Sequence, residues 1–370
     1  MEKNIGRDDV SNQRRLRLSK DLIYFLRPCL IGFLILIMVG AVCGSLVFGS
    51  VKIPISQIFV VFGKALGFEI LSDIVRRDEV ILLGIRLPRT ILCVLVGGGL
   101  AISGAALQGL FRNPLADPSL IGVSSGAALA AVAIIVLGVN EWAFLPDQLS
   151  YLILPLGAFI GGLVATFCVY TIASYQGKTS ISTMLLTGIA INALASAGLG
   201  FLIFSSDDQQ LRDLNFWLLG SLAGVTWYKV LAIAPIVIVA SVFLVFLGRH
   251  LNALLLGERE AFHIGFYVEK TKIVVIVLVA LVTGACVALT GIIGFIGLVV
   301  PHLIRLMFGS NNKFVLPCSV ILGAGLLTIA DIISRHIVWP AELPIGILTS
   351  CVGGPFFLWL IMRQKRYQVK

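Results

Sequence analysis

Long apolar runs separated by short polar breaks occupy most of the chain between residues 27 and 362. A helix needs about 20 apolar residues to cross a bilayer, and ten runs reach or approach that length. The runs are continuously apolar, whereas the strands of a membrane barrel alternate apolar and polar positions. The pattern therefore predicts an all-α, polytopic membrane protein with about ten transmembrane helices. The predicted spans are 27–49, 90–110, 119–138, 152–173, 181–204, 228–248, 272–292, 294–308, 314–334 and 344–362.

The second and third runs show the most unusual pattern. The stretch 86–128 begins with arginines, continues as a glycine-rich apolar run, breaks at Arg112-Asn113-Pro114 and returns to small residues. Small side chains let membrane helices approach one another backbone to backbone. A simple anchor gains nothing from such close packing, so this stretch predicts the wall of a transport pathway. The run 294–308 is short and glycine-rich, and its ends are the hardest to place.

Three polar segments are longer than simple turns. The segment 50–86, with the charged run Asp73–Glu79, is expected to cover the outer mouth. The segment 205–227 has leucines at amphipathic spacing, which predicts a short helix in the membrane surface. The segment 249–271 is too polar to span, and its glycine hinge is followed by charged residues. It predicts either a helical segment that binds a soluble partner, called the handle below, or an ordinary solvated loop, and composition favours neither.

Composition and charge agree with a membrane protein. Of the 370 residues, 58% are hydrophobic and 13% are charged, so lipid must replace water over much of the surface. Ten crossings place both termini on one side, and basic clusters at 14–20 and 363–366 make that side cytoplasmic. The whole chain, 1–370, is predicted to form one transmembrane domain with a cytoplasmic segment 1–26. The net charge of +9 therefore reflects topology, and no soluble basic face is expected to bind nucleic acid.

Sequence motifs for catalysis are missing. The chain has no P-loop, no His-Glu-x-x-His and no Gly-x-Ser-x-Gly, and its seven cysteines form no Cys-x-x-Cys pair. We therefore expect no metal site and no catalytic residue. His302 follows Pro301 in an apolar run, and we expect a structural histidine with a hydrogen bond rather than a group that faces the pathway.

Few charged groups lie within the apolar runs, where Asp331 is nearly alone. A proton-coupled carrier needs several intramembrane carboxylates, so the sequence disfavours a secondary carrier. A membrane enzyme acting on lipid-linked substrates would need clustered His, Asp or Ser, and it remains the weaker alternative. The energy for transport is expected from a separate motor bound to the segment 249–271.

Several ordered motifs resemble the permeases of type II ABC importers, which carry iron–siderophores, haem and cobalamin. The resemblance covers residues 20–365 and implies a homodimer of ten-helix subunits in the bacterial inner membrane. It also implies two ATP-binding subunits below the permease and a periplasmic substrate-binding protein above it. Those ATPase subunits would use ATP and Mg, and this chain would bind no cofactor. The motifs are Arg-Leu-Pro-Arg at 86–89, Asn-Pro-Leu-Ala-Asp-Pro at 113–118, Gly-Val-Ser-Ser-Gly at 122–126, Leu-Gly-Glu at 256–258, Gly-Phe-Ile-Gly-Leu-Val-Val-Pro-His at 294–302, Ala-Asp-Ile at 330–332 and Ala-Glu-Leu-Pro-Ile-Gly at 341–346.

The resemblance also implies roles for individual residues. Arg86, Arg89 and Arg335 would receive acidic residues of the binding protein, since guanidinium groups pair well with carboxylates. The alternative for these arginines is snorkelling to the membrane interface. The handle would form coupling helices in a cleft of the ATPase, through Asn252, Leu256, Gly257, Glu258, Arg259, Ala261 and Gly265. Two turns would form the cytoplasmic gate, through Asn113, Leu115, Thr179, Ser180 and Ile181.

The expected cargo rests on two segments, 181–193 and 208–217, which look most like the haem-uptake branch of the family. Haem is therefore the expected cargo, with ferric siderophore second and cobalamin third. The segments 95–104 and 281–291 are weakly similar in sequence, which agrees with two pseudo-repeated halves, an arrangement common in transporters.

Overall fold

The computed structural model describes residues 27–49, 51–67, 76–138, 152–338 and 340–368. Each of the ten predicted runs corresponds to one helix, so the predicted all-α membrane fold is confirmed. Seven helices are long and apolar enough to cross a bilayer within the described ranges. The helices that match the ten runs are Arg27–Val47, α4 (Leu87–Phe111), α5 (Val123–Val136), α7 (Ile153–Ala173), α8 (Ile181–Phe204), α10 (Trp227–Phe246), α13 (Val268–Thr290), α14 (Ile296–Phe308), α15 (Asn312–His336) and α16 (Ile345–Gln368).

Two of these helices, α5 and α14, are shorter than a bilayer is thick. With 14 and 13 residues they extend only about 20 Å at 1.5 Å per residue. Each begins at a residue with a left-handed backbone, Gly122 (φ 81°) for α5 and Phe295 (φ 68°) for α14. A helix cannot continue backwards through such a residue, so the preceding chain turns away. The expectation that run 294–308 is short is confirmed.

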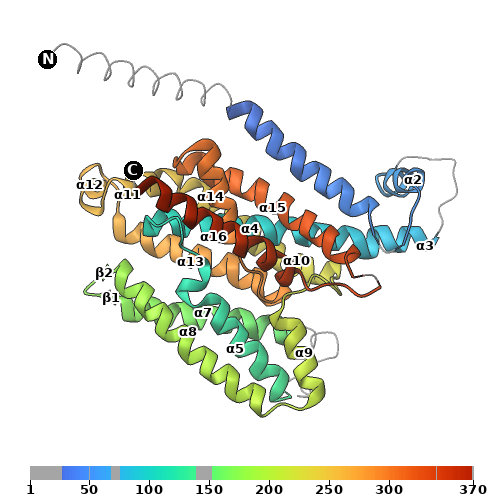
Figure 1. Cartoon of the computed structure of the whole chain (residues 1–370), viewed down its shortest axis with the longest axis horizontal. Coiled ribbons are helices and arrows are strands. Elements are labelled where there is room, and N and C mark those ends of the chain that lie inside the picture. Colours follow the sequence, from blue (N-terminus) through green and yellow to red (C-terminus); the bar gives the residue numbers. More distant parts are fainter. Residues whose placement is uncertain (1–26, 50, 68–75, 139–151, 339, 369–370) are drawn as a thin grey trace.

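Helix α4 runs through the middle of the bundle (Figure 1) and packs against α10, α13, α14 and α15. Its glycines permit this position because a Cβ atom on Gly97 would overlap the backbone of Gly323 on α15. A Cβ on Gly104 would likewise overlap the backbone of Gly297 on α14. The predicted close backbone packing of this helix is therefore confirmed, with α15 and α14 as its neighbours.

Helices α5, α7 and α8 form a separate layer below α13 in Figure 1. Gly126 of α5 and Gly161 of α7 meet backbone to backbone, so these two helices are tightly joined. Helix α8 leaves most of its apolar surface uncovered: Phe201 is 71% exposed and Phe204 is 89% exposed. This face therefore needs lipid or another protein surface to cover it.

The polar segments also form helices. The segment 205–227 contains α9 (Asp208–Leu218), whose start is fixed by a capping box between Asp207 and Gln210. The segment 50–86 contains α2 (Ile55–Ala65), α3 (Arg76–Glu79) and a π-helical stretch (Val80–Arg86) that leads into α4. Part of the charged run at 73–79 lies outside the described residues, as do residues 1–26.

The segment 249–271 forms two short helices, α11 (Gly248–Leu255) and α12 (Glu258–His263). Gly257 separates them with φ 122°, a conformation that L side chains rarely adopt, so the expected glycine hinge is present. A feature that the sequence did not indicate lies beside them. The chain between α7 and α8 forms a small antiparallel hairpin of β1 (Ser174–Tyr175) and β2 (Lys178–Thr179).

Candidate functional site

Charged residues gather at two opposite ends of the bundle. Trp227, at the start of α10, donates a 2.8 Å hydrogen bond to the Leu83 carbonyl just before α4. Helix α10 then carries the chain to α11 at the far end. We call the group Arg86, Arg89, Asp331, Arg335 and Glu342 the arginine cluster. The group Thr179, Glu258, Glu269 and Lys272, beside α12, is the lysine cluster.

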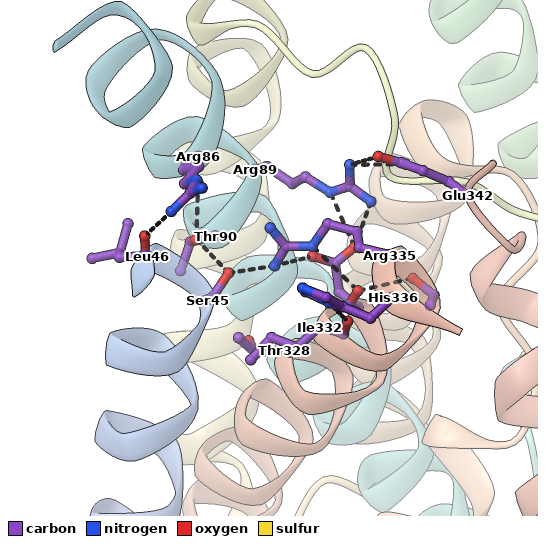
Figure 2. Close-up of polar contacts among 12 residues, drawn as sticks. Ser45, Leu46, Arg86, Arg89, Thr90, Thr328, Ile332, Arg335, His336 and Glu342 are labelled. Atoms are coloured by element: carbon purple, nitrogen blue, oxygen red, sulfur yellow. Dashed lines mark hydrogen bonds and ion pairs between the residues drawn. The ribbon is translucent and has the colours of Figure 1, made fainter. Parts of the chain in front are cut away.

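Arg89 pairs with both carboxylates of the arginine cluster, and Figure 2 shows its contact with Glu342. Its Nε and Nη2 atoms donate to Oδ1 of Asp331 at 3.0 and 2.8 Å. Its Nη1 atom donates to both carboxylate oxygens of Glu342 at 3.0 and 2.9 Å. One planar guanidinium thus bridges α4, α15 and the turn that precedes α16.

Arg335 adds a second cation to the same carboxylate. Its Nη2 atom forms an ion pair with Oδ2 of Asp331 at 2.9 Å, and it also donates to Ser45 Oγ at 2.9 Å. Asp331 is fully buried, while Arg89 and Arg335 are 9% and 7% exposed. A buried carboxylate is tolerated only where opposite charges and hydrogen bonds replace water. The two guanidinium groups supply the opposite charge and Arg89 the hydrogen bonds, all to Oδ1; Oδ2 has its ion pair with Arg335 and no hydrogen bond within the described residues.

Arg86 contacts backbone rather than carboxylates. Its Nη1 atom donates to the carbonyls of Leu46 and Val47 at 2.5 and 3.0 Å, and its Nη2 atom donates to the Val51 carbonyl. Arg86 is only 4% exposed. It therefore satisfies the free carbonyls where the helix Arg27–Val47 ends, close to α4 (Figure 2).

The three arginines that were expected to dock a binding protein thus lie at one end of the bundle, and all three are buried with partners in their own chain. Docking stays a prediction. A partner carboxylate would have to add to, or replace, the contacts already present. Glu342, whose side chain is 43% exposed, is the contact most open to replacement.

His302 corrects an expectation. It is 8% exposed on α14, and neither ring nitrogen has a hydrogen-bond partner among the described residues. The expected structural hydrogen bond is therefore not formed within the described part of the chain. Within the described ranges, no group of three or more His, Cys, Asp or Glu side chains is placed to hold a metal ion.

At the other end, α11 is attached to the bundle by amide groups. Nδ2 of Asn252 donates to Oδ1 of Asn311 at 2.7 Å, and the Asn312 backbone N–H donates to Oδ1 of Asn252 at 2.8 Å. Asn311 caps the start of α15, where its side chain accepts from the Lys313 N–H. Helix α11 is therefore fixed to the start of α15 by neutral hydrogen bonds.

Helix α12 and its flanks present apolar surface to the outside. Leu256, Phe262, Ile264 and Tyr267 are each more than half exposed, whereas Ala261 is fully buried against the bundle. Gly265 has φ 92° and ends the helical turn. Arg259 is exposed on the same helix. Helix α12 and its flanks therefore leave an uncovered apolar face on one part of the expected handle.

The two expected gate turns have distinct structures. Asn113 Oδ1 accepts a 2.9 Å hydrogen bond from the Leu115 N–H, which closes a tight turn after α4. Leu115 is 39% exposed. In the second turn, Thr179 is 5% exposed, and Ser180 caps α8 by accepting from the Thr183 N–H at 3.3 Å. Ile181 is the first residue of α8.

The lysine cluster joins the second gate turn to α12. Lys272 Nζ donates to the Thr179 carbonyl at 2.8 Å, to Glu258 Oε2 at 2.9 Å and to Glu269 Oε1 at 3.0 Å. Lys272 is 2% exposed. Sequence reasoning missed this residue, although a lysine three residues after Glu269 at the start of an apolar run is the signal that could have found it.

Asp331 was also underestimated, as a lone carboxylate near a helix end. Its spacing of four residues from Arg335 places both side chains on one face of α15, which the sequence could have shown. The contact to Arg89 spans 242 residues and carries no local signal. Asn192, the other polar residue noted within a run, receives a 2.5 Å hydrogen bond from Ser125 and donates to the Ser119 carbonyl.

A bundle of apolar helices, packed through glycines and bearing two short helices at one end, has the architecture of a multi-pass membrane permease. The chain belongs to the FecCD transport family, whose model matches residues 35–363, and it is a permease of the type II ABC importer class.

Curated relatives of this chain carry several cargoes. It is 43% identical over 338 residues to the hemin transport system permease HmuU of Yersinia pestis, covering 91% of this chain and 96% of that protein. It is 44% identical over 283 residues to the cobalamin import permease BtuC of Halobacterium salinarum, covering 76% and 73%. It is 32% identical to the iron(3+)-hydroxamate permease FhuG of Bacillus subtilis, covering 90% and 95%.

A solved structure shows the same fold. That protein, described as an inward-facing ABC transporter of the metal-chelate type, aligns with a TM-score of 0.76 and 31% identity. The alignment covers 91% of this chain and 99% of the other. The permease class is therefore established on both sequence and fold.

Proposed function

We propose that this chain is the permease of an ATP-driven importer that moves haem from the periplasm to the cytoplasm. The observation that carries the cargo assignment is the similarity to the hemin permease, which extends over nearly the full length of both chains. The cobalamin permease of Halobacterium salinarum is equally similar in identity but over a shorter alignment. Cobalamin is therefore the second candidate and a ferric siderophore the third, the reverse of the order expected from the sequence.

The active unit in this proposal is a homodimer in the bacterial inner membrane. The uncovered apolar face of α8 supports it, because a face of that kind is expected at a shared interface or in lipid. The basic segments before residue 27 and after residue 362 support cytoplasmic termini. With that orientation, α11 and α12 face the cytoplasm, and the arginine cluster faces the periplasm.

Energy comes from outside the chain in this proposal. The sequence has no P-loop, whereas α12 offers an exposed surface of apolar and charged side chains to a soluble partner. Two ATPase subunits, which bind ATP and Mg, would contact this surface. A periplasmic binding protein would contact the opposite end and pair its carboxylates with Arg86, Arg89 and Arg335. This chain itself holds no cofactor in the proposal.

The experiment reconstitutes the permease in proteoliposomes with its ATPase and binding protein, and measures uptake of haemin, cyanocobalamin and ferric hydroxamate in parallel. We expect haemin uptake that requires ATP and the binding protein. The matched control replaces the ATPase with a hydrolysis-deficient variant. Uptake by the permease alone under a proton gradient would contradict the importer proposal, while ATP-driven uptake of cyanocobalamin alone would change the cargo and keep the class.

A further inference from the structure

Lys272 lies where three elements meet: α12, the β1–β2 hairpin and α13. It is 2% exposed in the second turn of α13, and its ammonium group contacts Glu258 of α12, Thr179 of β2 and Glu269 of α13. An ammonium group has three hydrogens, and three acceptors lie within 3.0 Å. All of its donors are therefore in use.

The contact to Glu258 is the polar attachment of α12. Among the described residues, Glu258 is the one side chain of α12 that makes a hydrogen bond or an ion pair. It is the first residue of the helix and follows the hinge Gly257. The remaining contact of α12 with the bundle is apolar, through buried Ala261. When a partner moves α12, the hydrogen bond between Glu258 and Lys272 is therefore strained directly.

The contact to Thr179 reaches the start of α8. The Thr179 carbonyl accepts from Lys272, and the Thr179 N–H donates to Glu269 Oε2 at 2.9 Å. Its hydroxyl lies 3.0 Å from that of Ser174, across the hairpin. Both backbone groups of this residue are thus held by α13. Thr179 directly precedes Ser180, the cap of α8, so a displacement of Thr179 displaces the first turn of that helix.

We propose that Lys272 is a positioning residue that transmits movement of α12 to the start of α8, and so couples the partner ATPase to the second gate turn. The inference rests on the proposed importer function. If Glu258 moves with α12, an ammonium group that follows it weakens its hydrogen bond to the Thr179 carbonyl and so loosens the gate turn. The position of α12 is thereby linked to the position of the gate turn.

The neighbouring helix α11 does not share this route. Its Asn252 is bonded to Asn311 and Asn312 at the start of α15, with no charged partner among the described residues. Neutral amide bonds have fixed partners on one element, whereas Lys272 bridges two elements that are not otherwise bonded to each other by side chains in the described structure. The coupling is therefore assigned to α12 and not to the handle as a whole.

The test follows hydrogen–deuterium exchange in the complete complex of permease, ATPase and binding protein in nanodiscs, with and without ATP, Mg and vanadate. In the natural protein we expect exchange to change at both 257–264 and 176–184. In Lys272→Met, the change at 257–264 should persist and the change at 176–184 should be lost. Haemin uptake per ATP hydrolysed should then fall about tenfold, within the range of typical coupling between two sites.

Three further variants control the test. Lys270→Met removes an exposed lysine from the same turn of α13 and should respond as the natural protein does. Lys272→Arg keeps the charge and should restore part of the response at 176–184. Glu258→Gln weakens the α12 side of the link, because it removes the charge of the acceptor without touching the buried lysine, so it tests the same route if Lys272→Met does not assemble.

The outcomes separate the two claims. A response at 176–184 that survives in both Lys272→Met and Glu258→Gln would overturn the coupling role. Equal loss of the response at both segments in those variants would also overturn it, because it would show a purely structural defect in binding the ATPase. If 257–264 in the natural complex does not respond to the nucleotide while ATP-driven haemin uptake persists, the coupling role fails and the importer proposal stands; absence of that uptake in the natural complex would count against the importer proposal instead.

Discussion

The arginine cluster and the lysine cluster each bury one charged group between opposite charges, but they differ in access to water. Asp331 is fully buried between two arginines that are less than a tenth exposed. Lys272 is equally buried, yet the side chains of its carboxylate partners Glu258 and Glu269 are 41% and 31% exposed. Water can therefore replace a carboxylate partner of Lys272, but it cannot replace either arginine partner of Asp331.

The clusters also differ in what they join. The arginine cluster joins α4 and α15, which already pack backbone to backbone at Gly97 and Gly323. The lysine cluster joins the six-residue helix α12 to a hairpin. Buried ion pairs thus reinforce a rigid helix contact at one end of the bundle and link two peripheral elements at the other end. Burial of the partner, and not the number of ion pairs, therefore separates a fixed contact from one that can rearrange.

The largest effect is expected from Asp331→Asn. Removal of this carboxylate leaves Arg89 and Arg335 buried with less opposite charge, which typically costs about 3–5 kcal/mol of stability. Thermal unfolding of the purified protein in detergent measures the loss. The control is Asp208→Asn, at the exposed start of α9. An Asp331→Asn protein as stable as the natural one would show that the arginine cluster is no fixed contact.

Lys272→Met should reduce stability less, by about 1–2 kcal/mol, because water can solvate the two carboxylates that remain. Methionine also retains most of the apolar contact of the lysine stem. The same unfolding measurement applies, with Lys270→Met as the matched control. A loss as large as that of Asp331→Asn would remove the distinction between the two clusters.

Arg86→Lys tests the third arginine. A lysine cannot reproduce the fork that serves the carbonyls of Leu46, Val47 and Val51, so we expect a loss of about 1 kcal/mol. Faster amide exchange at 44–52 would be its local signature. Arg76→Lys, at an exposed position on α3, is the control. Unchanged exchange at 44–52 would contradict the role of Arg86 at this helix end.

The smallest effect on stability is expected from Glu342→Gln, below about 1 kcal/mol, because its side chain is partly exposed. This variant also tests whether the binding protein docks at Arg89. Loss of this carboxylate frees Nη1 of Arg89 for a partner, so the affinity for the binding protein should rise about twofold to fivefold at low salt. Glu79→Gln, an exposed carboxylate before α4, is the control for net charge. An equal rise in both variants, or none in Glu342→Gln, would argue against docking at Arg89.

Much of the fold could be predicted because each span is a local property. The run 181–204 matches α8 to the residue, and Gly257 marks the hinge between α11 and α12 as expected. The family resemblance also pointed to Thr179 and Glu258. Their connection could not be predicted, since it depends on Lys272, which lies 93 residues from Thr179. The predicted hydrogen bond at His302 was wrong for the same reason, because such a bond depends on which groups the neighbouring helices place beside the ring.

By itself, the sequence determined that this protein is a bundle of about ten membrane helices with one polar handle, and which family it resembles. Whether a segment enters lipid depends on its own side chains and its own internal hydrogen bonds. Each membrane span can therefore be predicted from its own residues. Only the tertiary structure decided which charges meet: Asp331 with Arg89 and Arg335, and Lys272 with Thr179 and Glu258. An ion pair acts over a few ångströms, and the depth and rotation of one helix against another set that distance.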